Sequence, residues 1–393
     1  MAASSSIQLL TPALAILVLS FLKLSTSARA SAGSCYKSII GFGDSLTDTG
    51  NLVQLFPPDN PTHCYRPPYG ETFFKHPTGR CCDGRLIIDF IAESFGLPLV
   101  PAYLWRDEST DFRQGVNFAV SGATALNNSF FLEMGLQDLS TNVSLGTQLR
   151  WFKDILPSLC SSNSSDCSRE FLQSSFVLMG EIGGDDYNAA LLGGIKPDEV
   201  KPYVPGVVRE IASAIEELIK LGAVTLVVPG NFPIGCLASY LTYFQSSSQH
   251  DYDTDTGCIN WLNDLAKYHN RLLQKELNRI RKLHPHATII YADYYNAAMR
   301  FYRSPNKYGF RGEALRACCG TGGPYNCNTS IPCGYLPATP CKDPSLYVTW
   351  DGLHLTEAAY QLVAQGILQG PYSTPPINTI CPLASTSSGG LLL

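Results

Sequence analysis

The chain has 393 residues, of which 45% are hydrophobic and 16% are charged, and its net charge is −5 at pH 7. This length and apolar content suffice for one large domain with a full core or for two smaller ones. The acidic balance, without a basic run, argues against nucleic acid and anionic membrane surfaces as partners.

The N-terminal segment has the features of a signal peptide. Residues 9–22 are almost all apolar, and residues 28–30, Ala-Arg-Ala, fit a small-residue cleavage site, so we expect residues 1–30 to be removed. An N-terminal anchor is the alternative, but the apolar run is short for a membrane span of ~20 residues. All 14 cysteines follow Ala30, an even number that suits an oxidising compartment. We therefore expect a secreted protein.

The cysteines and sequons carry further expectations for a secreted chain. Cys160 and Cys167 bracket a polar segment and could close a small loop, whereas the vicinal pairs 81–82 and 318–319 should bond elsewhere. No two C-x-x-C motifs have the spacing of a zinc site. Four N-x-S/T sequons mark glycosylated or unmodified surface asparagines: Asn127, Asn142, Asn163 and Asn328.

Strand-like and helix-like segments alternate along the rest of the chain. Short apolar runs predict strands over residues 38–44, 174–179, 224–230 and 287–295, and residues 115–125 predict a strand that breaks into a small-residue turn. Helical spacing predicts helices over residues 85–96, 204–223, 259–283 and 356–368, the last with Thr356 as N-cap. This alternation predicts a parallel sheet covered on both faces, in one α/β domain over residues 31–382.

Two segments stand apart from this alternation. Residues 316–341 are rich in cysteine and predict a long loop, and loops of that length are usually functional. Residues 383–393 have low complexity and are expected to form a disordered tail.

Ser45 is a candidate nucleophile. It follows the predicted strand 38–44 between small residues, where a hydroxyl group would be exposed at a strand–helix junction. The alternative is a helix N-cap, a position that serine favours. The surrounding GFGDSLTDTGN is not a dinucleotide fingerprint, because Leu46 replaces the third glycine, and it is not a G-x-S-x-G nucleophile elbow.

His354 is a candidate base, because Asp351 precedes it by three residues at a predicted loop–helix boundary. An acid at this spacing can orient an imidazole that takes a proton from serine. The alternative is a surface Asp and His at a helix start. The other histidines lack such company, and the two in HPH fit a solvated turn better than a metal site: His63, His76, His250, His269, His284 and His286.

Two glycine-containing segments offer further groups. Gly122, in NFAVSGATA, can present a backbone N–H to an oxyanion, or it can form a plain tight turn. Asp185 and Asp186 follow the predicted strand 174–179, so both should lie at the carboxyl end of a strand, where open α/β sheets bind ligands. The adjacent carboxylates could bind a metal, act as an acid–base pair, or stand where another residue type is expected.

Four segments occur in a fixed order with wide spacing: FGDSLTDTGN, NFAVSGATA, GEIGGDDYN and WDGLHLTEAAY. Together they resemble the four motif blocks of the plant GDSL esterase/lipase family, a branch of the SGNH hydrolases. The likeness covers almost the whole chain after residue 30. It implies a flavodoxin-like three-layer α/β/α sandwich with a parallel sheet.

The resemblance also implies roles for individual residues. Ser45 would be the nucleophile, His354 the general base and Asp351 the acid that orients it. The backbone N–H groups of Ser45 and Gly122 would form an oxyanion hole, with a side-chain amide from the third block as third donor. No metal and no other cofactor is implied.

The third block departs from the family pattern at one position. The family usually has G-G-N-D, whereas here Asp185 stands where the amide donor is expected and Asp186 matches the family aspartate. An ionised Asp185 would repel an oxyanion, and loss of one such donor costs about 10²–10³ in rate. Asp185 could be protonated, helped by Asp186. It could instead turn away, or the protein could have lost hydrolase activity.

The resemblance implies acyl transfer through an acyl-Ser45 intermediate, with three possible outcomes. With water as acceptor, the protein is an esterase of small acylated plant metabolites such as phenylpropanoid esters, secreted to the apoplast or the vacuole. With a bound alcohol it is an acyltransferase of, for example, hydroxycinnamoyl or caffeoyl groups, and a weakened oxyanion hole could suit this if the alcohol outcompetes water. The third possibility is a catalytically silent binding protein. We expect no nucleic-acid partner and no membrane segment in the mature chain.

Overall fold

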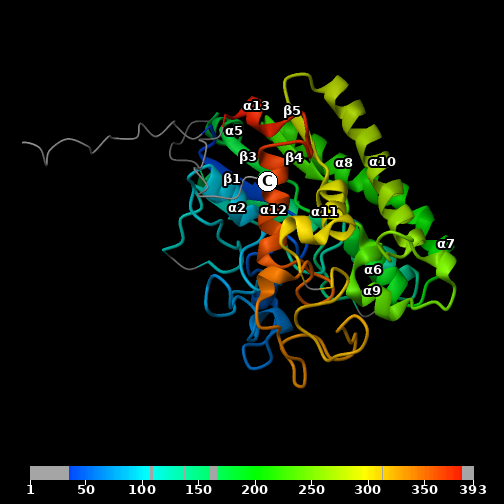
Figure 1. Cartoon of the computed structure of the whole chain (residues 1–393). Helices are drawn as coiled ribbons and strands as arrows, with labels where there is room; N and C mark the ends of the chain where they lie inside the picture. Colours follow the sequence, from blue (N-terminus) through cyan, green and yellow to red (C-terminus); the bar gives the residue numbers. More distant parts are fainter. Residues whose placement is uncertain (1–34, 107–108, 137–138, 160–165, 312, 383–393) are drawn as a thin grey trace, which may run out of the picture. The chain divides into compact units, whose positions relative to one another are not determined.

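Figure 1 shows the chain as a computed structural model. The structure describes residues 35–106, 109–136, 139–159, 166–311 and 313–382. The expected signal peptide 1–30, Cys160, the sequon at Asn163 and the tail 383–393 lie outside these ranges.

A six-stranded sheet forms the centre of the described chain, in the order β2-β1-β3-β4-β5-β6. Its strands are β1 (Ser38–Gly41), β2 (Gly115–Asn117), β3 (Ser175–Leu178), β4 (Thr225–Pro229), β5 (Thr288–Ala292) and β6 (Ser373–Thr374). The first five strands are parallel, in the flavodoxin-like order 2-1-3-4-5. β1 is central in this order, with Ile40 opposite both Val116 and Val177.

The predicted parallel sheet is confirmed, with one addition. β6 pairs antiparallel with β5 at the edge of the sheet, through Tyr291–Thr374 and Ala292–Ser373. β6 has only two residues, Ser373 and Thr374, and no apolar run, so the sequence does not predict this strand. In the segment 115–125, the predicted strand is β2, and beyond Asn117 the chain turns into the loop that carries Gly122, as the small residues there predict.

Helices cover both faces of the sheet. They are α2 (Ile87–Ser94), α3 (Asn128–Glu133), α4 (Leu145–Ile155), α5 (Cys167–Gln173), α6 (Gly184–Leu192), α7 (Pro197–Val200), α8 (Val204–Leu221), α9 (Ala238–Tyr243), α10 (Asn260–Leu283), α11 (Tyr294–Arg303), α12 (Glu357–Leu368) and α13 (Ile377–Ile380). Short 3₁₀ segments are η2 (Leu52–Leu55), η3 (His63–Tyr65), η4 (Leu156–Leu159), η5 (Lys201–Tyr203), η6 (Ile234–Cys236), η7 (Gln249–Asp251), η8 (Pro305–Tyr308) and η9 (Pro344–Leu346).

The strand order explains how the helices divide between the faces. From β1 the chain crosses to β2 in one direction, and from β3 to β4 it crosses in the other. Since such crossovers are right-handed, their helices lie on opposite faces. Accordingly α2 packs with α12, and α8 packs with α10, as Figure 1 shows.

The four helices predicted from the sequence are present. α8 places an apolar stripe in the core, with Val208, Ile211 and Ile215 buried, and it ends at Gly222, whose φ is +124°. Thr356 caps α12, because its side chain accepts a hydrogen bond from the backbone N–H of Ala359. α2 is shorter than predicted, since Gly96 has a left-handed φ of +68° and ends the helical pattern.

Five disulfides join cysteines of the described ranges: Cys35–Cys381, Cys64–Cys81, Cys236–Cys258, Cys318–Cys341 and Cys319–Cys333. The prediction that the vicinal cysteines bond elsewhere is confirmed for three of them, whereas Cys82 keeps a buried free thiol. Two of the five disulfides close the predicted long loop 316–341. None of the helices described in the structure is both long and apolar enough to cross a bilayer.

Candidate active site

The candidate residues meet at the carboxyl ends of the strands. Ser45 follows β1 and Asp185 follows β3, the two strands from which the chain departs in opposite directions. In open α/β sheets this switch point leaves a crevice that binds ligands. His354 reaches the same place from the loop before α12.

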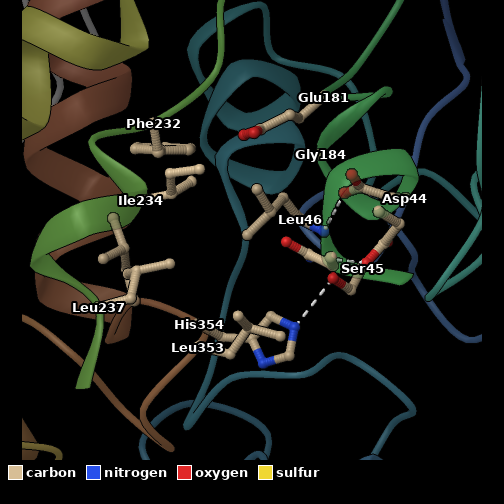
Figure 2. A pocket seen from close by; sticks show the side chains of 13 residues that line it. Asp44, Ser45, Leu46, Glu181, Gly184, Phe232, Ile234, Leu237, Leu353 and His354 are labelled. Carbon is tan, nitrogen blue, oxygen red and sulfur yellow. Dashed lines mark hydrogen bonds between the residues drawn. The ribbon is translucent and has the colours of Figure 1, made fainter. Parts of the chain in front are cut away.

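Ser45, His354 and Asp351 form a hydrogen-bonded chain. The Oγ of Ser45 lies 2.9 Å from Nε2 of His354, and Nδ1 of His354 lies 2.8 Å from Oδ2 of Asp351. Figure 2 shows the first of these bonds at the rim of a pocket. This is the geometry of a serine nucleophile, its base and an orienting acid.

The structure excludes the two structural alternatives for these residues. Ser45 is not a helix N-cap, because the next helical segment, η2, begins only at Leu52 after Asn51. Asp351 and His354 are not a surface pair, since each side chain is 5% exposed.

Asp351 is held by four donors. Its Oδ1 accepts hydrogen bonds from the backbone N–H groups of Leu353 (3.0 Å) and His354 (2.8 Å). Its Oδ2 accepts from the hydroxyl group of Tyr69 at 2.8 Å, in addition to the imidazole. Tyr69 is buried and comes from a loop far away in the sequence, so sequence spacing gave no sign of this contact.

The charges of the pair set their pKa values. Burial alone would raise the pKa of Asp351, but the charge and hydrogen bonds of His354 hold it well below its usual range. Burial alone would lower the pKa of His354, but Asp351 outweighs this effect and the pKa is raised. His354 is therefore a stronger base than a free imidazole, and Asp351 stays ionised beside it.

The buried carboxylates of Asp48 and Asp186 hold the loops around Ser45 in place by hydrogen bonds. Oδ2 of Asp48 accepts hydrogen bonds from the backbone N–H (2.8 Å) and the hydroxyl group (3.1 Å) of Ser121. This joins the turn after β1 to the loop of Gly122, whose φ is +82°. A side chain at Gly122 would also collide with Ser140, so both the backbone and the space there require glycine.

Asp186 fastens the third block to the second. Its carboxylate accepts hydrogen bonds from the backbone N–H groups of Ala125 (2.7 Å) and Leu126 (2.9 Å). Asp186 is fully buried, and burial raises its pKa to about 7 against the opposing effect of these two bonds. The two adjacent aspartates therefore face different partners and do not form a paired site.

Asp185 faces the site. It lines the pocket beside Ser45 and a larger groove of about 500 Å³ that Gly122 also lines. Its Oδ1 accepts a hydrogen bond from the side-chain amide of Asn188 at 2.8 Å, and Asn188 in turn accepts one from Tyr240. Burial raises the pKa of Asp185, while Asn188 and the charge of His354 oppose the rise.

The pocket beside Ser45 contains residues that the sequence analysis did not single out. Figure 2 shows Asp44 and Glu181 among the lining side chains, with Phe232, Ile234 and Leu237 as an apolar wall. Glu181 stands directly before the Ile-Gly-Gly of the third block, and Asp44 directly before Ser45. Both residues lie within the quoted motifs. Their places at the ends of predicted strands were the one sequence signal that they line the site.

The remaining sequence predictions concern the surface. The described sequon residues Asn127, Asn142 and Asn328 are all exposed, as glycosylation would require. Their glycosylation stays a prediction. Among the described side chains, one group has metal-ligating atoms close together, His63 with Cys64 and Cys81, and its two sulfurs form a disulfide.

Comparison with known proteins adds independent information. Residues 39–367 match the family model described as GDSL-like lipase/acylhydrolase. A sinapine esterase of Brassica napus is 53% identical over 90% of this chain and 90% of its own length. The GDSL esterase/lipase At1g28590 of Arabidopsis thaliana is 54% identical over 88% of this chain and 85% of its own. A solved phospholipase A1 of Streptomyces albidoflavus NA297 matches 83% of this chain and 94% of its own chain, at 13% identity and a TM-score of 0.34.

Proposed function

The chain belongs to the GDSL lipase/acylhydrolase family of ester-cleaving enzymes, and on this premise we propose that it is a secreted serine esterase of small acylated metabolites. The observation that carries the proposal is the hydrogen-bonded chain from Ser45 through His354 to Asp351. The five disulfides of the described ranges support an oxidising, secretory environment.

In the proposed reaction, Oγ of Ser45 attacks the ester carbonyl carbon while Nε2 of His354 takes the hydroxyl proton. The ionised Asp351 stabilises the imidazolium that forms. His354 then gives the proton to the leaving alcohol, which leaves an acyl group on Ser45. A water molecule, deprotonated by His354, attacks the acyl group in the second step, and the acid leaves.

The oxyanion of each tetrahedral intermediate needs hydrogen-bond donors. We assign this task to the backbone N–H groups of Ser45 and Gly122 and to a protonated Asp185. The raised pKa of Asp185, caused by burial, supports a carboxylic acid that donates its proton in a hydrogen bond. The side-chain amide of Asn188 donates a hydrogen bond to Oδ1 of the same carboxyl group.

The substrates in the proposal are phenylpropanoid and similar esters. The groove of about 500 Å³ next to Gly122 has room for an acyl group of this size. The sinapine esterase relative supports an ester of this kind as substrate. The test is hydrolysis of a panel of such esters, with the acid and alcohol products identified. Release of both products by the purified protein, but not by Ser45→Ala, is expected; no hydrolysis of any ester would contradict the proposal.

A second candidate, acyl transfer to an alcohol, is favoured by one observation, the carboxyl group at position 185. A weak oxyanion hole gives an advantage to a bound acceptor over water. Product analysis with added alcohol separates the two functions. If transfer dominates because of Asp185, then Asp185→Asn should raise hydrolysis relative to transfer, and an unchanged ratio would contradict this candidate.

A further inference from the structure

A second cavity lies between α7, η5 and the N-terminal half of α10, and we call it the α7–α10 pocket. Its volume is about 380 Å³, within the range of ordinary small-molecule sites. It shares none of its described lining residues with the pocket beside Ser45 or with the groove next to Gly122. Figure 1 shows α7 beside this part of α10. The proposed ester cleavage therefore leaves this pocket without a role.

Two aromatic side chains of α10 form one wall of the pocket. Trp261 and Tyr268 are both half-buried, and their spacing of about two helical turns places them on the same side of the helix. Trp261 is held in place by Phe244, whose ring meets it edge to face with the ring centroids 5.2 Å apart. An aromatic ring that is already fixed can stack against a flat ligand at little cost in side-chain entropy.

Two cations of the lining converge on the same aromatic ring. The ammonium nitrogen of Lys201 lies 5.5 Å from the ring centroid of Tyr268, and the guanidinium carbon of Arg271 lies 5.8 Å from it. Neither cation forms an ion pair within the described ranges, whereas the neighbouring Lys267 pairs with Asp264 at 3.1 Å. Charge-assisted hydrogen bonds to a carboxylate would satisfy both groups, and arginine can bind a carboxylate through two parallel bonds.

Two acids of the lining limit how much negative charge a ligand can bring. Asp198 of α7 and Asp264 of α10 are both exposed and line the pocket. Lys267 neutralises Asp264, so Lys201 and Arg271 exceed the remaining acid by one charge. The two carboxylates repel a polymer of phosphates but accept hydrogen bonds from hydroxyl groups. The lining therefore fits a ligand with several hydroxyl groups, a ring that can stack, and few negative charges.

We propose that the α7–α10 pocket binds an oligosaccharide that carries a carboxylate on a terminal sugar. The carboxylate binds Arg271 and Lys201, and a sugar ring stacks on Trp261. Hydroxyl groups of the sugar donate to Asp198 and Asp264. Because the pocket is separate from the groove next to Gly122, a bound acidic sugar holds the protein on a glycan while the groove stays free.

Matched sugar pairs and titration calorimetry test this site on the whole protein. Cellobiouronate is compared with cellobiose, in which a CH₂OH group replaces the carboxylate. A second pair, α-1,4-digalacturonate and α-1,4-galactobiose, offers another ring stereochemistry. At pH 7 and low salt we expect the charged member to bind at least tenfold more tightly in one pair or both. This preference should fall at least threefold at about 0.5 M salt, because salt screens exposed charges.

The variants Lys201→Gln and Arg271→Gln each remove one cation at an exposed position. We expect each to weaken binding of the charged sugar at least fivefold and to change binding of the neutral sugar less than twofold. Lys275→Gln makes the same change one turn further along α10, exposed and outside the pocket, and should keep the wild-type affinity. Trp261→Leu should weaken both members of a pair, because it removes the stacking ring without changing the charge.

Three results would overturn the site. The first is equal affinity for the charged and neutral sugars, or no binding of either pair. The second is a charged sugar that binds Lys201→Gln and Arg271→Gln as tightly as the wild type, since it would then bind elsewhere. The third concerns benzoate, which has a carboxylate and a ring but no hydroxyl groups. We expect benzoate to bind at least tenfold more weakly than the charged disaccharide, and equal or tighter binding would contradict a sugar as ligand.

This inference and the proposed function fail separately. Calorimetry measures binding without ester cleavage, so an absence of hydrolysis would leave the sugar site intact. An absence of sugar binding would likewise leave the reaction at Ser45 intact.

Discussion

Tyr69 donates a hydrogen bond of 2.8 Å to Oδ2 of Asp351, the same oxygen that lies 2.8 Å from His354. Tyr69 and His354 therefore both form hydrogen bonds with the same oxygen of Asp351. The loop of Tyr69 is fixed in turn by the disulfide Cys64–Cys81, which closes around it. The position of Asp351 therefore depends on a segment outside the four motif blocks.

Tyr69→Phe removes this donor without changing the ring. Oδ2 of Asp351 then accepts from His354 alone, so the pKa of His354 should rise further and the acid limb of kcat/KM should move to higher pH. Loss of a buried hydrogen bond to a charged group should lower the free energy of unfolding by about 1.5–3 kcal/mol. The pH profile and denaturant unfolding measure the two effects. Tyr335→Phe, at an exposed position, is the control; a Tyr69→Phe profile identical to that of the wild type would contradict the role of Tyr69.

Asp185→Asn supplies an oxyanion donor that needs no proton. In the wild type, hydrolysis should fall as pH rises through the raised pKa of Asp185, because the ionised group cannot donate. The variant should lose this fall and exceed the wild-type kcat at least about tenfold at alkaline pH.

Rates from pH 5 to 9 test this prediction. Asp255→Asn makes the same chemical change at an exposed position and should keep the wild-type profile. A wild type without an alkaline decline, or a variant slower than the wild type throughout, would show that Asp185 does not act as a protonated donor.

Asp186→Asn should weaken the fold. The amide can accept from only one of the two backbone N–H groups of Ala125 and Leu126, so we expect a loss of about 1–3 kcal/mol in the free energy of unfolding. The pKa of Asp186 is raised to about 7, above its unfolded value of about 4. Its contribution to stability is therefore complete below about pH 4 and is lost as pH rises through about 7.

Denaturant unfolding between pH 4 and 8 checks both statements about Asp186. The wild type should lose stability across this range more steeply than the variant, which has no group to ionise at this position. Parallel pH dependences would contradict the assigned titration.

The disulfide Cys35–Cys381 joins the two ends of the described chain across 346 residues. Replacing both cysteines by serine should lower the free energy of unfolding by about 2–5 kcal/mol, because the bond restricts the unfolded chain. Cys35 precedes β1 at the edge of the sheet opposite the site, so kcat at 25 °C should stay the same. Unfolding midpoints with and without the two substitutions measure the effect; an unchanged midpoint would contradict it.

The sequence predicted the parts of this molecule that depend on local pattern. The strands up to β5 are short apolar runs, and α8 and α10 have a clear helical period, so their existence could be predicted within a few residues. Ser45, His354 and Asp351 could be proposed because they lie in recognisable blocks. The strand β6 could not be predicted, since two residues at the edge of a sheet have no periodicity of their own.

The rest of the site depends on residues brought together by the fold. Tyr69 reaches Asp351 from 282 residues away, and no spacing rule connects them. Glu181 has an ordinary place in the sequence, and only the fold shows that it is buried and lines the pocket beside Ser45. The disulfide partners were equally beyond prediction, because connectivity follows from tertiary contacts.

The central claim is that Ser45 is the nucleophile, and it is tested most directly by labelling the folded protein with a fluorophosphonate probe and locating the adduct by peptide mass spectrometry. The account predicts one adduct, on Ser45, that is absent in Ser45→Ala and forms much more slowly in a folded His354→Ala variant. An unlabelled Ser45 in folded protein across pH 4 to 9, or an adduct on another serine, would contradict it.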